Sequence, residues 1–361
     1  MMDAGYNANQ IHPDWYDVIR TTKLPSFKNQ YGPNGNTYFS ARQSRLGVKG
    51  VIPTDLGDLK TTFEFEMFGT GVDAGQTTIR LRHAYGELGQ FGAGQYWSPF
   101  MDIDVFPNTV EYWGPPGMAF FRNVQVRWMP IQGNTRMSIA LERPGASADG
   151  GVVADRIELT DVKPRFPVPD ISAEYRYSPG KWGYVELAGI YRRIEWKDQG
   201  LLPGDISGGV SGWGFNLSSN LNFGANDILR LSALYGEGIE NYMNDAPADV
   251  GLKATGNAAA PVEGEALPVS GFVGFLDHTW SPQFASSVGY SSVNITNSEL
   301  QAPSAFRRGQ YAIGNIIYMP VPGVMTVAEL QWGNRHNFSD GFKSDIFKIQ
   351  FSFKYNFSKT F

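Results

Sequence analysis

Basic residues recur at even spacing in strand-like segments of this sequence. Arg80 and Arg82 flank Leu81, and Arg45 and Lys49 share one parity further upstream. Because a strand turns successive side chains to opposite faces, each pair would lie on one face. A guanidinium presents a planar fork of donors that suits carboxylate or phosphate groups. The spacing therefore predicts a row of anion-binding sites along the polar face of a sheet.

The same parity argument extends this basic row to further strands. Arg127 lies on the parity opposite the apolar residues Val126 and Trp128. Arg42 and Arg122 fall on the apolar parity, but both lie near the expected outer ends of their strands, where a bulge can re-aim a side chain. The candidate anion-binding residues are therefore Arg42, Arg45, Lys49, Arg80, Arg82, Arg122 and Arg127. Four more arginines share the inward parity further along the chain: Arg136, Arg176, Arg192 and Arg230.

Acidic residues on the same strands leave a second interpretation open. Four glutamates also fall on inward parities: Glu64, Glu66, Glu174 and Glu186. If they pair with the arginines, the field along the sheet would be neutral on average. Unpaired arginines would instead favour anions, as rings of Arg and Lys do in pores. The net charge of -5 does not decide between these interpretations, because acidic loop residues contribute to it.

Strands with one apolar and one polar face would have to position these residues. Sixteen segments show this alternation, the first at Trp15–Arg20 and the last at Asp345–Phe361. No amphipathic helix pattern appears, and no run approaches the 18 apolar residues of a spanning helix. The last segment alternates aromatic with polar residues and ends on Phe361, which resembles the C-terminal signature of outer-membrane β-barrels. Taken alone, this stretch also fits a half-buried strand of a soluble β protein.

The connections between these strands alternate between short and long. The long ones are residues 21–36, 98–119, 144–169, 197–209 and 240–269. Transmembrane barrels alternate tight periplasmic turns with long extracellular loops, whereas a soluble sandwich has no reason to collect its long loops at one end. We therefore predict an all-β fold, a single sixteen-stranded antiparallel transmembrane β-barrel over residues 1–361 in a Gram-negative outer membrane. Its apolar parity would face lipid or another subunit, and its polar parity would face water.

Five motifs in the first 130 residues carry a more specific resemblance. They are FSARQSRLG at 39–47, DLGDLKTTFEF at 55–65, IRLRHAYG at 79–86, GAGQYWSPFMD at 92–102 and RNVQVR at 122–127. Together they resemble the DcaP-like family of trimeric outer-membrane porins and, more distantly, the phosphate-selective porins. The resemblance implies a homotrimer that takes up small anions, among them dicarboxylates and aromatic carboxylates such as phthalate.

The beginning of the chain lacks two features that the resemblance implies. The stretch MMDAGYNANQ has neither a basic nor an apolar signal-peptide region, so we expect a mature or trimmed chain. Family members often carry an N-terminal coiled-coil segment, and no heptads appear here, so we expect that segment to be absent or removed.

The third long connection, residues 98–119, is aromatic and contains four prolines. In trimeric porins the third loop folds into the barrel, and the resemblance implies that this segment forms the constriction. Asp102, Asp104 and Glu111 would then face the basic wall and set a transverse field. An ordinary surface loop is the alternative. A metal site at Asp102 and Asp104 is disfavoured, because two carboxylates make a weak ligand set.

Composition argues against several other classes of function. There is no cysteine, hence no disulfide or thiolate site, and the net charge of -5 argues against nucleic acid as a partner. There are four histidines, His12, His83, His278 and His336. The two on predicted strands, His83 and His278, show no triad spacing, and we expect such a histidine to be a packed or subunit-interface residue. We therefore expect neither catalysis nor a cofactor.

Two other barrel functions stay open beside anion uptake. A general diffusion porin would lack anion preference, and a plugged surface receptor or adhesin would use the long loops at 144–169 and 240–269. The density of inward arginine favours anion uptake, because a scaffold would not need it. The partners we expect are small anionic solutes, the lipid bilayer, lipopolysaccharide and further copies of the chain.

Overall fold

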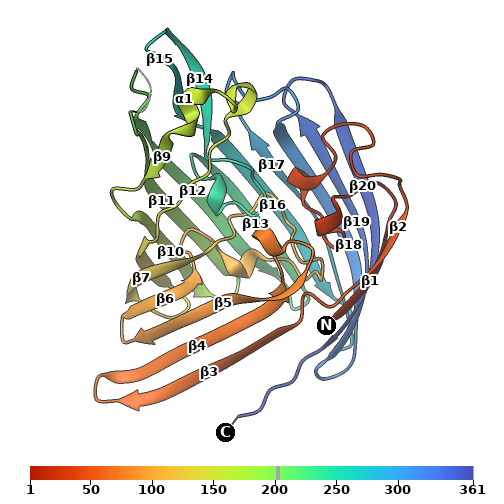
Figure 1. The fold of residues 1–361 in the computed structure, drawn as a ribbon. Coiled ribbons are helices and arrows are strands. Elements are labelled where there is room, and N and C mark those ends of the chain that lie inside the picture. Colours follow the sequence, from red (N-terminus) through yellow and green to blue (C-terminus); the bar gives the residue numbers. More distant parts are fainter. Residues whose placement is uncertain (201–203, 361) are drawn as a thin grey trace.

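One large antiparallel sheet closes on itself to form a barrel (Figure 1). The computed structural model describes residues 1–200 and 204–360. At the closure, β1 (Met2–Asn7) pairs with β20 (Lys343–Tyr355) on one side and with β2 (Asn36–Ser40) on the other. The predicted all-β barrel is confirmed.

The barrel strands follow one another around the sheet in chain order. The remaining strands are β3 (Arg45–Thr54), β4 (Gly57–Phe68), β5 (Thr77–Leu88), β6 (Phe91–Trp97), β7 (Arg122–Ile131), β8 (Arg136–Glu142), β9 (Val162–Arg165), β10 (Asp170–Gly180), β11 (Gly183–Asp198), β12 (Gly208–Phe223), β13 (Asp227–Glu237), β16 (Pro268–Thr279), β17 (Phe284–Ile295), β18 (Phe306–Val321) and β19 (Val324–Asn337). A separate hairpin, β14 (Val250–Asn257) and β15 (Ala260–Ala266), rises from the long connection after β13.

The sheet has eighteen strands, where sixteen were predicted. One extra strand arises because residues 41–44 interrupt a single barrel position and divide it into β2 and β3. The other is β9, which pairs with the outer end of β11, beyond the β10 pairing. Sixteen positions around the barrel therefore remain, with two local departures from regular pairing.

Helices are few and short. They are the α-helix α1 (Ile157–Thr160) and the 3-10 turns η1 (Pro13–Trp15), η2 (Thr21–Lys23), η3 (Gly71–Asp73), η4 (Ile103–Val105), η5 (Gly151–Val153) and η6 (Glu240–Tyr242). None of the described helices has the length and apolar character needed to cross a membrane.

The predicted first strand, Trp15–Arg20, is wrong. This stretch belongs to the connection 8–35, where η1 and η2 occur, and the first strand is β1. Pro13 occupies the first turn of η1, and the His12 side chain accepts a hydrogen bond from the backbone N–H of Asp14. Capped turns of this kind satisfy the backbone locally and compete with strand pairing.

The last strand shows how its two parities divide between the barrel faces. Outward Phe351 is 60% exposed, whereas its inward neighbour Gln350 is fully buried. Strand β20 ends at Tyr355, earlier than predicted, and Phe361 lies outside the described residues. The outward band of aromatic and aliphatic side chains is the surface that meets lipid or another subunit.

The apolar core lies inside the barrel and fills one sector of it. Inward residues of β16 and β18, including Val273, Phe275 and Ile313, are buried against Leu24 and Met118 from the long connections. In this sector the inward parity is therefore apolar and packed, unlike the polar inward parity of β20. A continuous apolar run on both parities of β16 is the sequence signal for such a strand.

Candidate functional site

The connection 98–119 crosses the barrel interior from β6 to strands far around the sheet. At one end, the Ser218 hydroxyl of β12 donates to Asp102 at 2.7 Å. At the other end, Glu329 of β19 accepts hydrogen bonds from the backbone N–H groups of Val110 (2.7 Å) and Glu111 (2.9 Å). The predicted infolding of this loop is confirmed, and the surface-loop alternative is wrong.

A second connection, residues 8–35, also packs inside the barrel, which the sequence reasoning did not anticipate. Its Trp15 ring lies 4.7 Å from the Trp113 ring of the 98–119 loop. Asp245 holds the segment by accepting hydrogen bonds from Thr21 (2.9 Å) and from the backbone N–H of Thr22 (3.0 Å). The two infolded segments together narrow the interior.

Six charged side chains on strands β3 to β7 form one compact group, here called the Glu66 cluster. Its members are Arg45, Arg80, Arg82, Arg122, Glu64 and Glu66. Four arginines thus share two carboxylates, which leaves a formal surplus of two positive charges.

Glu66 is the common partner of all four arginines in this cluster. Its side chain is fully buried and lies 2.9 Å from Arg80 Nε and 2.7 Å from Arg82 Nη1. Arg45 and Arg122 lie further away, at 3.6 and 4.0 Å. A bulge in β5 places both Arg82 and its neighbour His83 in the buried interior.

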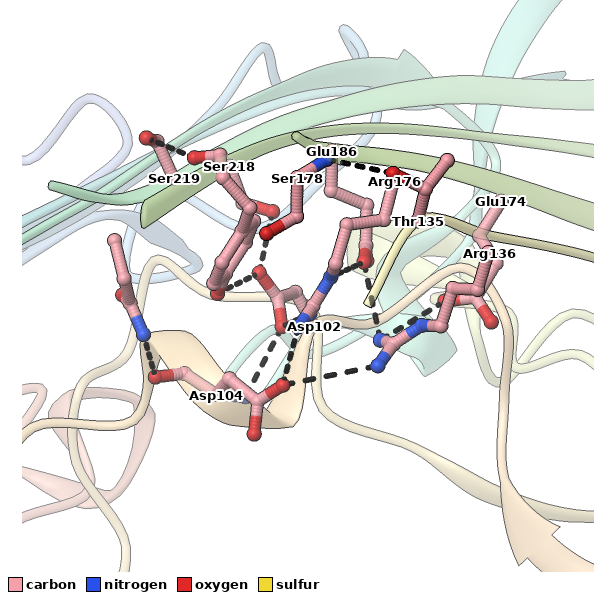
Figure 2. A network of polar contacts seen from close by, with 12 residues as sticks. Asp102, Asp104, Thr135, Arg136, Glu174, Arg176, Ser178, Glu186, Ser218 and Ser219 are labelled. Atoms are coloured by element: carbon pink, nitrogen blue, oxygen red, sulfur yellow. Dashed lines mark hydrogen bonds and ion pairs between the residues drawn. The ribbon is translucent and has the colours of Figure 1, made fainter. Parts of the chain in front are cut away.

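A second group on strands β8 to β11 and the infolded loop is here called the Asp102 cluster. Its members are Asp102, Asp104, Arg136, Glu174, Arg176 and Glu186. Figure 2 shows these side chains converging from the loop and from the barrel wall. Two arginines share four carboxylates, which leaves a formal surplus of two negative charges.

Arg176 is the common partner of the loop and the wall in this second cluster. It lies 2.7 Å from Asp102, 2.6 Å from Asp104 and 2.6 Å from Glu186. Arg136 completes the cluster with Glu186 at 3.1 Å and Glu174 at 3.4 Å. The Tyr184 hydroxyl donates to Asp102 at 2.6 Å.

Two acidic residues of the infolded loop, Asp102 and Asp104, lie against Arg136 and Arg176, which belong to the further arginines of the inward parity. Asp102 and Asp104 pair with Arg176, while the loop residue that contacts the Glu66 cluster is Tyr112, whose hydroxyl donates to Glu66. Glu111 is buried elsewhere and accepts from the backbone N–H of Ile19 at 2.8 Å. Burial raises the pKa of Glu111 above its usual range.

The other predicted basic residues occupy three different environments. Arg42 is fully buried and paired with Asp17, since the interruption between β2 and β3 turns it inward, and it does not face open space. Lys49 is exposed on β3. Arg127 donates to Gln125 at 3.0 Å and has no carboxylate partner among the described residues.

Arg127 lines a cavity of about 320 Å³ between the infolded loop and strands β4 to β10. The charged residues around this cavity are Lys60, Glu87, Arg127, Arg136 and Glu174, and the aromatic ones are Tyr96 and Trp97. Three cations and two carboxylates therefore line it. The cavity is a candidate binding site for a solute.

Several residues that shape the site were missed in the sequence. Glu329 lies on an inward parity opposite Leu330 and was identifiable by that signal. Asp17, Tyr112 and Asp245 lie in connections, where parity has no meaning, so no local pattern identifies them.

Nothing in the described ranges favours a metal centre. Within residues 1–200 and 204–360, no group of three or more His, Cys, Asp or Glu side chains is arranged to hold a metal ion. His83 packs against the rings of Tyr96 and Trp97, each 4.7 Å from its own.

The chain matches one protein family along most of its length. The family model described as DcaP outer membrane protein matches residues 19–357. No curated protein matches the chain significantly.

Solved structures share this fold at low sequence identity. The outer membrane channel DcaP of Acinetobacter baumannii has a TM-score of 0.82 and 19% identity, covering 99% of this chain and 94% of that one. The anion-selective porin from Comamonas acidovorans has a TM-score of 0.60 and 11% identity, with coverage of 99% and 97%. The trimer form of OmpT from Vibrio cholerae has a TM-score of 0.52 and 12% identity, with coverage of 98% of each chain.

Proposed function

The chain belongs to the DcaP outer membrane protein family, and from that premise we propose that it is an outer-membrane channel that prefers small anions. The family and the similar structures place the barrel in the outer membrane and support a channel or porin function. The proposal has two further parts. The channel prefers anions, and its solutes are dicarboxylates or aromatic carboxylates such as phthalate.

The observation that carries the proposal is the surplus of arginine in the Glu66 cluster. Four guanidinium groups share Glu64 and Glu66, and the more loosely held Arg45 keeps 42% of its side chain exposed. Arginine in a narrow aqueous passage raises the local concentration of anions. Several weak sites, rather than one strong site, also let the solute leave again.

The cavity beside Arg127 supports an aromatic carboxylate as one solute. Arg127 and Lys60 supply cations that no carboxylate neutralises within ion-pair distance in the described chain, while Tyr96 and Trp97 supply ring faces. A planar aromatic acid would use both features, since its carboxylate suits the guanidinium fork and its ring suits the aromatic wall.

A general diffusion channel without anion preference is the second candidate, and one observation favours it. The Glu66 and Asp102 clusters together contain six arginines and six carboxylates, so their formal charges cancel. Anion preference then requires that the positive surplus of the Glu66 cluster lies apart from the negative surplus of the Asp102 cluster, so that an anion can pass close to the positive one.

The proposal includes a homotrimeric assembly. One structure with the same fold is a trimer form, that of OmpT, and barrels of this family type are expected to present an apolar outer band to a neighbouring subunit. Lipid and lipopolysaccharide would surround the remaining outer face.

Recording across a planar bilayer with a KCl gradient tests the proposal. We expect a reversal potential of the sign given by anion preference, and current block by phthalate and succinate. The variant R127Q should weaken the phthalate block about tenfold by losing a charge-assisted hydrogen bond. R165Q, at an exposed position paired with Glu195, is the matched control and should leave the block unchanged. Cation preference without block would contradict the proposal.

A further inference from the structure

Two cations and a histidine lie together on the outer face of the barrel, at the end that carries the long loops. They are Arg308, His336 and Lys343, here called the outer basic patch. Arg308 pairs in register with His336, and His336 pairs with Lys343, so these three residues form one row across β18, β19 and β20. Arg308 Nη2 lies 3.1 Å from His336 Nε2.

The register shows that this row faces outward. Residues two apart on a strand share a face, and so do residues paired across strands. Four positions below His336 and Lys343 on the same parity lie Trp332 and the outward Phe347, which is 57% exposed. The patch therefore stands above the apolar outer band, at the level where the barrel leaves the hydrocarbon.

The cations of the patch form no ion pair in the described part of the chain. No carboxylate there lies within ion-pair distance of Arg308 or Lys343. The adjacent acid, Asp345, instead accepts hydrogen bonds from Asn334 at 2.8 Å and Trp332 at 3.2 Å.

An apolar groove runs down the same strands directly below the patch. Its volume is about 590 Å³, and its lining includes Val288, Ala312, Gly314, Leu330 and Ile349. A Cβ added to Gly314 would meet only Val288 Cγ2, at 3.9 Å, so the glycine leaves the groove floor open. A straight hydrocarbon chain fits a groove of this kind.

We propose that the patch and groove together bind a phosphorylated, acylated lipid of the outer leaflet, of the lipid A type. Its phosphate would sit on Arg308 and Lys343, and one acyl chain would lie over Gly314. The strand spacing from Arg308 to Gly314 is about 20 Å, at roughly 3.4 Å per residue. That length spans a headgroup and the upper part of an acyl chain. The inference goes beyond the channel function, because solute passage does not use this outer face.

The chain offers a matched control elsewhere on the same rim. Arg165 and Arg193 also lie at the outer end of the sheet, but both contact Glu195, at 2.7 and 2.9 Å. Their charge is already partly offset, and neither residue lines the groove below the patch. Removing them changes the total charge as much as removing Arg308 and Lys343 does.

Binding of lipid A to the purified, detergent-solubilised protein tests the proposal by native mass spectrometry and titration. R308Q/K343Q should weaken binding of diphosphorylated lipid A at least tenfold, whereas R165Q/R193Q should not change it. G314L should weaken lipid A binding but leave the weaker binding of inorganic pyrophosphate unchanged. All variants should keep the wild-type conductance, which shows that the barrel is folded.

Three results would overturn the proposal. Dephosphorylated lipid A binding as tightly as the diphosphorylated form would remove the role of the patch. Pyrophosphate binding as tightly as lipid A would identify a free-phosphate site and remove the role of the groove. Crosslinks from Gly314→Cys to a second copy of the chain would show that a subunit, and not a lipid, covers the groove.

Discussion

The Glu66 cluster and the Asp102 cluster contain the same residue types in opposite proportions. Four arginines surround two carboxylates in the first, and four carboxylates surround two arginines in the second. The same infolded loop contacts both, through Tyr112 at one and Asp102 at the other. The two clusters therefore differ in which charge is in excess, and the scarcer and the more abundant charges have different roles.

In each cluster the scarcer charge holds the group together, and the more abundant charge supplies the field. Glu66 is fully buried and meets all four arginines of its cluster, while Arg176 meets three carboxylates of the other. Removing such a shared partner leaves several buried like charges facing one another. Removing one of the abundant charges relieves that repulsion.

The largest effect is expected from E66Q. The change should lower the free energy of unfolding by about 3 kcal/mol, because four arginines lose their common carboxylate in a buried site. E174Q removes one of four carboxylates from the other cluster but keeps a side-chain oxygen that can accept from the Ser138 hydroxyl, so it should cost about 1 kcal/mol or less. Urea unfolding from lipid vesicles, followed by tryptophan fluorescence, measures both. Equal losses of unfolding free energy in E66Q and E174Q would show that the ratio of arginine to carboxylate in a cluster does not affect its stability.

The reciprocal change, R176Q, should have a similar effect on the second cluster. Asp102, Asp104 and Glu186 would lose their shared guanidinium, at a cost of roughly 3 kcal/mol. R80Q is the matched variant in the first cluster, where three arginines would remain for Glu66. The same unfolding experiment should find R80Q clearly less destabilised than R176Q. A reversed order would contradict the division of roles.

A smaller effect is expected from Y112F, which tests how the loop is attached to the first cluster. The Tyr112 hydroxyl donates to the buried Glu66, and its loss should cost about 1–2 kcal/mol, typical of a hydrogen bond to a charged group. Y191F removes a hydroxyl at an exposed outer position and is the control. No change in the unfolding midpoint for Y112F would mean that other contacts hold the loop.

The sequence predicted the parts of the structure that depend on strand periodicity. Barrel architecture, the later strands and the shared inward parity of Arg80, Glu66 and Arg176 all follow from a period of two. Pairing between neighbouring strands, such as Arg80 with Glu66, also required the register, which the alternation of apolar faces constrains.

Contacts made by loops were beyond prediction from the sequence. Asp102 and Arg176 lie 74 residues apart, and no local pattern relates them. The infolding of residues 8–35 depends on burying Trp15 and Ile19 against a barrel interior that exists only after closure. Arg42 falls on the apolar parity, and the break between β2 and β3 turns it inward, but its partner there is Asp17 of the connection 8–35, which no local pattern identifies.

The most direct test compares the reversal potentials of R45Q and D104N in a KCl gradient. Arg45 and Asp104 are the most exposed members of their clusters, with 42% and 48% of their side chains exposed, so neither change should unfold the barrel. One charge about 8 Å from a passing ion is worth about 0.5 kcal/mol in water, or roughly twofold in permeability ratio. We predict that R45Q lowers the anion-to-cation ratio and that D104N raises it. Shifts of the same sign, or no shift in either variant, would contradict the claim that the two surpluses set the charge preference.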